Sequence, residues 1–149
     1  MTDKGAAGRS VTAGVAQGTE LPALEVGPLT LSDFVRWAGY QENWIRVHYD
    51  GVFAREHVGL AGPIQSGHYR TALLTRMVTD WVGSAGWMRR LAVRHTGPVG
   101  CGDLVRCEGR VRQVRAADDH ATTVEVDIWA VGRDGQRVSE GTASVEIRA

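Results

Sequence analysis

The sequence has little of what would tie a protein to charged partners or to an oxidising compartment. Its 149 residues carry 17 basic and 17 acidic side chains, so the formal net charge is zero. No chain-wide attraction to nucleic acid or to an anionic membrane surface is therefore expected. Only two cysteines are present, Cys101 and Cys107, on either side of a turn-like Gly102-Asp103. Because nothing marks the chain as secreted, they are predicted to be free thiols rather than a disulfide.

Long hydrophobic runs and cofactor motifs are also missing. No apolar run reaches the roughly 18 residues that a membrane-spanning helix needs, and the start Met1-Thr2-Asp3-Lys4 lacks the order of a signal peptide. We therefore expect a cytoplasmic protein with no membrane segment. No paired histidines or cysteines stand at metal-ligand spacing and no glycine-rich phosphate loop is found, so no metal and no cofactor is expected.

The chain is long enough for one domain and too short for two. Residues 1–19 consist mainly of Gly, Ala, Ser and Thr, which cannot offset the entropy of ordering, so they are predicted to form a flexible tail. The single domain is placed at residues 20–149. Its stretch from Gly39 to Gly62 has no sustained period, apart from a helical turn near Phe53, and is predicted to be a long ordered loop.

Two helices and a set of strands are predicted around that loop. The pattern from Thr30 to Asp33 is a capping box that opens a short helix, and Ser66-Gly67 opens a longer helix that Gly83 ends. Strand-like alternation of apolar and polar residues follows around Leu91, Val105–Val111, Val124–Ala130 and Ala143–Ile147. A long helix followed by an antiparallel meander predicts an α+β domain in which the sheet wraps around the helix.

The loop and the start of the long helix carry a family resemblance. The segments His48-Tyr49-Asp50, Gly62-Pro63-Ile64, Val78-Thr79-Asp80-Trp81 and Gly102-Asp103 resemble the signature of MaoC-like proteins. That family contains R-specific enoyl-CoA hydratases and acyl dehydratases, and the resemblance covers roughly residues 30 to 111. It implies a hot-dog fold, in which an antiparallel sheet wraps a central helix.

The resemblance implies that His48 is the catalytic base. Histidine suits this role because its reference pKa of about 6.5 lets it exchange a proton near neutral pH. Five residues earlier the family usually has an aspartate, where this chain has Asn43. An amide can orient water or a hydroxyl but cannot accept a proton as a carboxylate does. Glu42 is the alternative carboxylate, if the loop path is shifted by one residue.

Gly67 is the third candidate, because the family's glycine at this turn donates its backbone N–H to the thioester oxygen. The N-terminus of the helix adds its positive end to that donor. The simpler interpretation is a helix entry that needs a small residue, and both interpretations require the same glycine. Ser66 stands where the family often has histidine and is a secondary candidate.

Two further residues are candidates for substrate binding. Arg94 follows the long helix and could meet the phosphates of coenzyme A, although alternating arginines on strands are usually solvated. Tyr49 could line an acyl pocket with Tyr40, Trp44 and Phe53, or these aromatic side chains could simply pack the loop against the domain.

Taken with the resemblance, these residues predict a hydro-lyase for a 2-enoyl or 3-hydroxyacyl thioester carried on coenzyme A or an acyl carrier protein. A dimer is expected, either a homodimer or a heterodimer with another hot-dog subunit, because a lone sheet leaves an unpaired edge. Two alternatives stay open. One is a non-catalytic or half-site subunit of a heteromeric MaoC-like hydratase, and the other is a tailoring dehydratase or cyclase of secondary metabolism.

Overall fold

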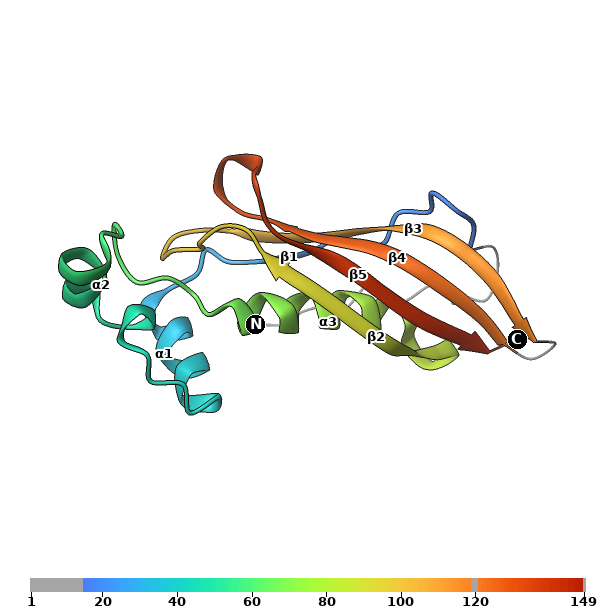
Figure 1. Cartoon of the computed structure of the whole chain (residues 1–149), viewed down its shortest axis with the longest axis horizontal. Coiled ribbons are helices and arrows are strands. Elements are labelled where there is room, and N and C mark those ends of the chain that lie inside the picture. Colours follow the sequence, from blue (N-terminus) through green and yellow to red (C-terminus); the bar gives the residue numbers. More distant parts are fainter. Residues whose placement is uncertain (1–14, 119–120, 149) are drawn as a thin grey trace.

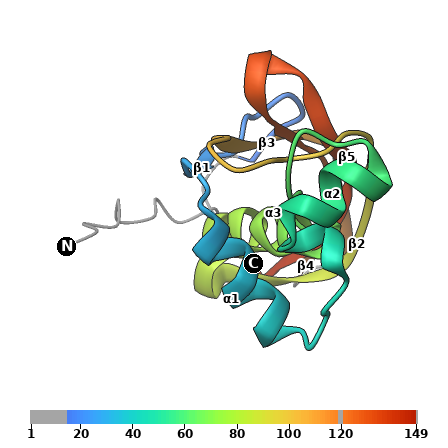
Figure 2. The same cartoon turned by 90° about the vertical axis from the view of Figure 1, so that its left-hand side faces the viewer.

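The computed structural model describes residues 15–118 and 121–148. Five antiparallel strands form one sheet in the order β1-β3-β4-β5-β2. The strands are β1 (Leu24–Val26), β2 (Gly86–His95), β3 (Val105–Asp118), β4 (Ala121–Val131) and β5 (Arg137–Arg148). The α-helices are α1 (Leu31–Tyr40), α2 (Gly51–Val58) and α3 (Gly67–Val82), with 3-10 turns η1 (Arg46–His48), η2 (Gly83–Ala85) and η3 (Arg133–Gly135). The sheet curls around α3, as Figures 1 and 2 show, which confirms the predicted α+β architecture.

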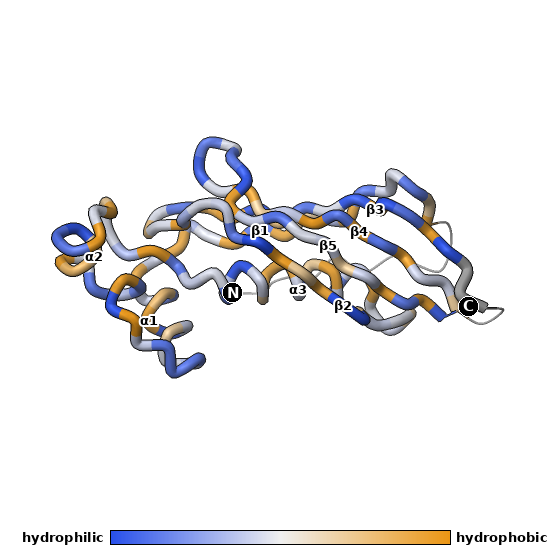
Figure 3. The backbone as a smooth tube through the Cα atoms, in the orientation of Figure 1, coloured by the Kyte–Doolittle hydropathy of each residue, from blue (hydrophilic) through white to orange (hydrophobic). Residues whose placement is uncertain are grey.

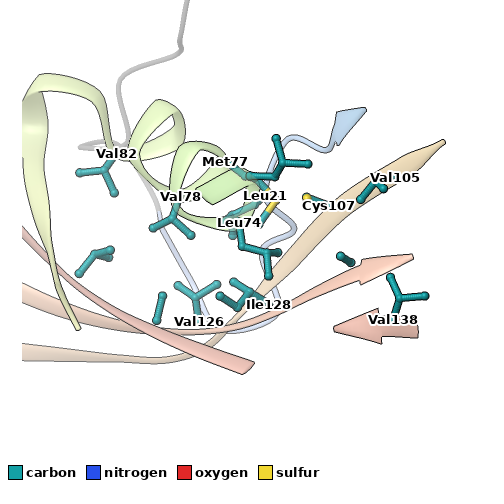
Figure 4. Close-up of a cluster of buried hydrophobic side chains, with 14 of the residues drawn as sticks. Leu21, Leu74, Met77, Val78, Val82, Val105, Cys107, Val126, Ile128 and Val138 are labelled. Carbon is teal, nitrogen blue, oxygen red and sulfur yellow. The ribbon is translucent and has the colours of Figure 1, made fainter. Parts of the chain in front are cut away.

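The core lies between α3 and the concave face of the sheet. One side of α3 is buried through Leu73, Leu74, Met77, Val78 and Val82. Alternate residues of the strands face it; in β4 these are Val124, Val126, Ile128 and Ala130, all at most 1% exposed. Figure 3 shows hydrophobic and hydrophilic residues alternating along the long strands, and Figure 4 shows how the buried side chains meet. Burial of this shared apolar surface is what holds the helix inside the curl.

The order of the strands differs from the meander expected from the sequence. β3, β4 and β5 are consecutive neighbours, but β2 pairs with β5 at the far edge rather than with β3. The connection from His95 to Val105 therefore crosses one end of the sheet. Alternation along a strand specifies which face is buried and not which strand lies beside it, so this crossover was not predicted.

The last residues of the predicted tail, residues 15–19, belong to the described part of the chain. Gly18 N–H donates to the Val111 carbonyl (2.8 Å), and Val111 N–H donates to the Thr19 carbonyl (2.8 Å). Glu20 continues this pairing with Arg110, and Val15 packs against the core. Gly18, Thr19 and Glu20 thus lie along β3 because backbone hydrogen bonds, which composition does not reveal, hold them there. Residues 1–14 lie outside the described part of the chain.

The helices that precede α3 form one end of the molecule. The capping box at the start of α1 is confirmed: Asp33 N–H donates to Thr30 Oγ1, and Thr30 N–H donates to Asp33 Oδ2 (2.8 Å). The segment expected to be a long loop contains the turn η1 and the eight-residue helix α2, which is longer than the single turn predicted. Figure 2 shows α1 and α2 at the end of the curled sheet, near the start of α3.

Two further expectations concern the thiols and the membrane. Cys101 is exposed and Cys107 is buried, and both are free, as predicted. Within residues 15–118 and 121–148, no helix is long and apolar enough to cross a membrane.

Candidate active site

A narrow cleft, too tight to admit a water-sized group, lies between α1, the loop that follows it and the start of α3. It is lined by Phe34, Trp37, Ala38, Gln41, Asn43, His48, Gln65 and Ser66. The structure therefore brings Asn43, His48 and Ser66 together from segments that are separated in the sequence. Gly67 follows directly at the first position of α3.

His48 ends the turn η1, and a hydrogen bond across the fold sets its imidazole. Nδ1 lies 2.9 Å from the carbonyl oxygen of Ile64. A carbonyl only accepts, so Nδ1 carries the hydrogen and Nε2 of the neutral ring keeps its lone pair. Ile64 N–H in turn donates to the Val47 carbonyl (3.1 Å), and Gln65 N–H donates to the Val99 carbonyl (2.7 Å). The tautomer needed for a base is thus fixed by the backbone that leads into α3.

The chain after His48 is also fixed. Asp50 caps α2 by accepting from Phe53 N–H (2.9 Å), and Arg46 Nη2 donates to the same carboxylate (2.6 Å). These two contacts, the Phe53 N–H first, hold the pKa of Asp50 below its usual range. Since Arg46 and Asp50 lie on either side of His48, this ion pair closes the turn that presents the histidine.

Asn43 and Glu42 diverge at the end of α1. Asn43 N–H donates to the Ala38 carbonyl (2.9 Å), and its side chain lines the cleft. Glu42 has a left-handed backbone with φ of 51° and is exposed, outside the cleft. The amide rather than the carboxylate therefore shares the cleft with His48.

Gly67 begins the 16-residue helix α3. The N–H of Ser66 donates to Gln65 Oε1 (2.8 Å), whereas no hydrogen bond of the Gly67 N–H is found within the described residues. The hydroxyl of Ser66, which is 4% exposed, makes no capping hydrogen bond. A Cβ at position 67 would lie 2.6 Å from Cδ2 of His95, so the ring of His95 also requires a glycine here.

His95 and Arg70 surround this helix start with basic groups. His95 Nδ1 contacts Ser139 Oγ (2.9 Å), and burial, with Arg70 and His68 nearby, lowers the pKa of His95. Arg70 is 4% exposed and donates to the Gly97 carbonyl (2.9 Å), and no carboxylate of the described residues pairs with it. Burial lowers the pKa of this guanidinium as well. The guanidinium of Arg70 therefore places positive charge at the same end of α3 as the N–H of Gly67, whereas the lowered pKa of His95 favours its neutral ring.

The two predicted substrate-binding residues lie outside the cleft. Tyr49 donates its hydroxyl to the Trp44 carbonyl (3.0 Å) and packs edge-on against the Trp44 ring. Arg94 lies on β2, is 77% exposed and donates to Glu140 on β5 (2.5 Å). It belongs to a different groove, on the strands, that also contains Arg110 and Trp129.

Several residues of the cleft were not singled out from the sequence. Trp37 lies on α1, Gln41 directly follows this helix, and Gln65 precedes the start of α3 and is only 2% exposed. The one signal in the sequence was a polar residue inside the apolar Pro63-Ile64 run that enters the helix. Among the described residues, no cluster of three or more His, Cys, Asp or Glu that could hold a metal ion is found.

Comparison with known proteins identifies the family. A family model described as MaoC like domain matches residues 15–131, so the chain belongs to the MaoC-like family. This membership implies hydro-lyase activity, that of a hydratase or dehydratase, in general terms. No curated protein matches the sequence.

Solved structures establish the hot-dog fold. The chain is similar to an (R)-hydratase from A. caviae involved in PHA biosynthesis, with a TM-score of 0.79 and 18% identity over 90% of this chain and 98% of that one. It is also similar to a chain of the ChsH1–ChsH2 complex from Mycobacterium tuberculosis, with a TM-score of 0.77 and 22% identity over 89% and 98% of the chains. The R-hydratase PhaJ1 from Pseudomonas aeruginosa gives a TM-score of 0.77 and 18% identity over 91% and 86%.

Proposed function

We propose that the protein is a hydro-lyase for a 2-enoyl or 3-hydroxyacyl thioester, carried on coenzyme A or an acyl carrier protein. The observation that carries this proposal is the meeting of His48 and Asn43 in one cleft, with Nδ1 of His48 held by the Ile64 carbonyl. The start of α3, with the N–H of Gly67, adjoins that cleft. A base, an amide and a hydrogen-bond donor are what the addition of water to an enoyl thioester needs.

In the direction of hydration, His48 Nε2 takes a proton from a water molecule that the Asn43 amide holds. The oxygen of this water forms a bond to C3 of the enoyl chain, and the electrons of the double bond move through C2 to the thioester oxygen. His48 then returns its proton to C2, so that H and OH are both accounted for without a carboxylate. Dehydration is the reverse sequence.

Negative charge develops on the thioester oxygen during this step, and the N-terminus of α3 is suited to stabilise it. The N–H of Gly67 supplies a donor, and the aligned peptides of the helix add a positive potential. Loss of one such donor in other enzymes costs about 10²–10³-fold in rate. Gln65 takes up the N–H of Ser66, which leaves the N–H of Gly67 as the donor for the substrate.

The test measures the hydration of crotonyl-CoA as the loss of the absorbance of its enoyl thioester. We expect His48→Ala to lose about 10²-fold or more, because the base is removed. Asn43→Ala should lose about tenfold, the scale of one hydrogen bond, and Asn43→Asp should keep or raise activity. Glu42→Gln is the matched control, because Glu42 is exposed outside the cleft. Full activity of His48→Ala would refute the assignment.

A second candidate is a half-site subunit of a heteromeric hydratase. The tightness of the cleft favours it, since the cleft leaves no room for a water-sized group, whereas a typical ligand pocket has a volume of roughly 300–1,000 Å³. The likeness to a chain of the ChsH1–ChsH2 complex points the same way. If the purified chain is inactive and gains activity only with a second MaoC-like chain, this candidate replaces the first.

A further inference from the structure

Arg70 is a buried cation that lacks a counterion among the described residues. It is 4% exposed, its Nη1 donates to the Gly97 carbonyl (2.9 Å), and its buried Nε has no hydrogen-bond partner there. None of the ion pairs formed within residues 15–118 and 121–148 includes it. Burial of an ion is costly unless an opposite charge compensates it, and arginine does not escape this cost by losing its proton.

The place of this charge on the helix adds to its cost. Arg70 lies in the first turn of α3, where the aligned peptides already produce a positive potential that disfavours a cation. Whereas side chains of Thr30 and Asp50 cap α1 and α2, α3 has no side-chain cap and no acidic residue in its first turn. A departure of this kind from local stability is typical of groups that are kept for function.

The side chain of Arg70 lies over the turn that begins with Gly67. Long side chains of a helix lean toward its N-terminus, so a residue at the fourth position covers the turn before it. The carbonyl that Arg70 binds belongs to Gly97, two residues after His95, and the ring of His95 packs against Gly67. Burial first, and then the charge of Arg70, lowers the pKa of that ring. The charge of Arg70 therefore acts at the helix start where the N–H of Gly67 lies.

We propose that Arg70 stabilises, through its electric field and without contact, the negative charge that develops on the thioester oxygen beside the N–H of Gly67. This inference rests on the proposed function and deepens it, because it adds a fixed charge to the donor and the helix. A fixed charge needs no reorganisation during the reaction. At an effective dielectric constant of about 20, two unit charges about 8–10 Å apart change an equilibrium by about 15–30-fold. For the partial charge of a transition state, we expect about tenfold in rate.

The first test measures how strongly the protein polarises the bound carbonyl. The isotope-edited infrared band of the crotonyl-CoA carbonyl is recorded in a His48→Ala background, which does not turn the ligand over. We expect binding to shift this band to lower frequency, and Arg70→Met to abolish most of the shift. Arg76→Met is the matched control, because Arg76 is an exposed arginine of the same helix that pairs with Asp80 (3.3 Å). An equal shift in Arg70→Met and its parent would overturn the proposal.

The second test uses kinetics with His48 intact. Arg70→Met should lower kcat for crotonyl-CoA about tenfold and leave KM nearly unchanged. Arg70→Gln keeps a donor for the Gly97 carbonyl but carries no charge, so it should lose as much, and it serves if Arg70→Met fails to fold. Full activity of Arg70→Gln would assign the residue to its hydrogen bond alone. A higher KM at unchanged kcat would mean that Arg70 binds an anionic group of the substrate, which would also overturn the proposal.

Thermal unfolding separates a charge kept for function from one kept for the fold. Arg70→Met removes a desolvated cation from the positive end of a helix and fills a similar volume, so its melting temperature should equal or exceed that of the parent. Activity that falls while stability is kept is the expected signature. A lower melting temperature together with an unchanged carbonyl band would show a purely structural role.

His95 reports the field of Arg70 in the absence of any thioester. In an NMR titration of its ring protons, the pKa of His95 should be higher in Arg70→Met than in the parent, because a nearby positive charge is removed while His68 is kept. An unchanged pKa would overturn the proposal for any substrate. If the pKa of His95 rises but the parent binds no thioester at millimolar concentration, the proposed function fails, and only the field at the helix start remains.

Discussion

Replacement of Gly67 by alanine tests why a glycine begins α3. The added Cβ would lie 2.6 Å from Cδ2 and 2.8 Å from Nε2 of His95, closer than real contacts allow. The ring must move and give up its 2.9 Å contact with Ser139 Oγ. Loss of that hydrogen bond costs about 0.5–1.5 kcal/mol, and overpacking of this kind costs about 1–3 kcal/mol. For a domain of this size, we expect the melting temperature to fall by roughly 3–10 °C.

The assay is thermal unfolding followed by circular dichroism, in two backgrounds. With His95→Ala the ring is gone, so Gly67→Ala should then cost little, and the two substitutions should be strongly non-additive. Gly62→Ala is the matched control, since a Cβ there would meet nothing within 4 Å. An equal loss from Gly67→Ala in both backgrounds would refute the steric reasoning. Because alanine keeps the backbone N–H, the double variant should also retain most of its hydratase activity.

Three other predictions concern the two thiols, the stability of the fold at acid pH and the assembly of the chain. A thiol reagent should label one cysteine in the native protein and two after unfolding, because burial raises the pKa of Cys107 to about 12; two labelled in the native state would contradict this. The lowered pKa of Asp50 stabilises the fold above about pH 4, and this contribution is lost as the pH falls. Asp50→Asn should keep the helix cap and reduce the loss of unfolding free energy on acidification, measured as unfolding free energy against pH. An unchanged loss would count against this role of the Asp50 carboxylate. Light scattering should give twice the chain mass of 16.1 kDa, since β2 ends the sheet with an unpaired edge, and a monomer at micromolar concentration would argue otherwise.

The local elements were predictable because their causes are local. The capping box from Thr30 to Asp33 and the glycine after Val82 mark helix ends through groups only a few residues apart. Strand alternation of period two likewise specifies the buried face of β4 without reference to any other strand. The family resemblance then singled out His48 and Gly67 as candidate site residues, before any contact was known.

The path of the loop between α1 and α2 could not be obtained in the same way. Glu42 adopts a left-handed backbone, which non-glycine residues rarely do, and this turns it outward while Asn43 stays in the cleft. The choice between these two neighbours depends on the hydrogen bond from Asn43 N–H back to Ala38 and on the packing of the loop.

Periodicity and capping residues thus determined from the sequence alone that an α+β domain with a sheet wrapped around a long helix would form. Tertiary structure alone decided that β2 lies beside β5, that Gly18, Thr19 and Glu20 lie along β3, and that Gln41 and Gln65 line one cleft with His48. The physical reason is the distance along the sequence over which each interaction acts. Helix caps and strand faces depend on neighbours in the chain, whereas strand order and the convergence of unpaired polar atoms depend on pairings between residues distant in sequence, which no local pattern specifies.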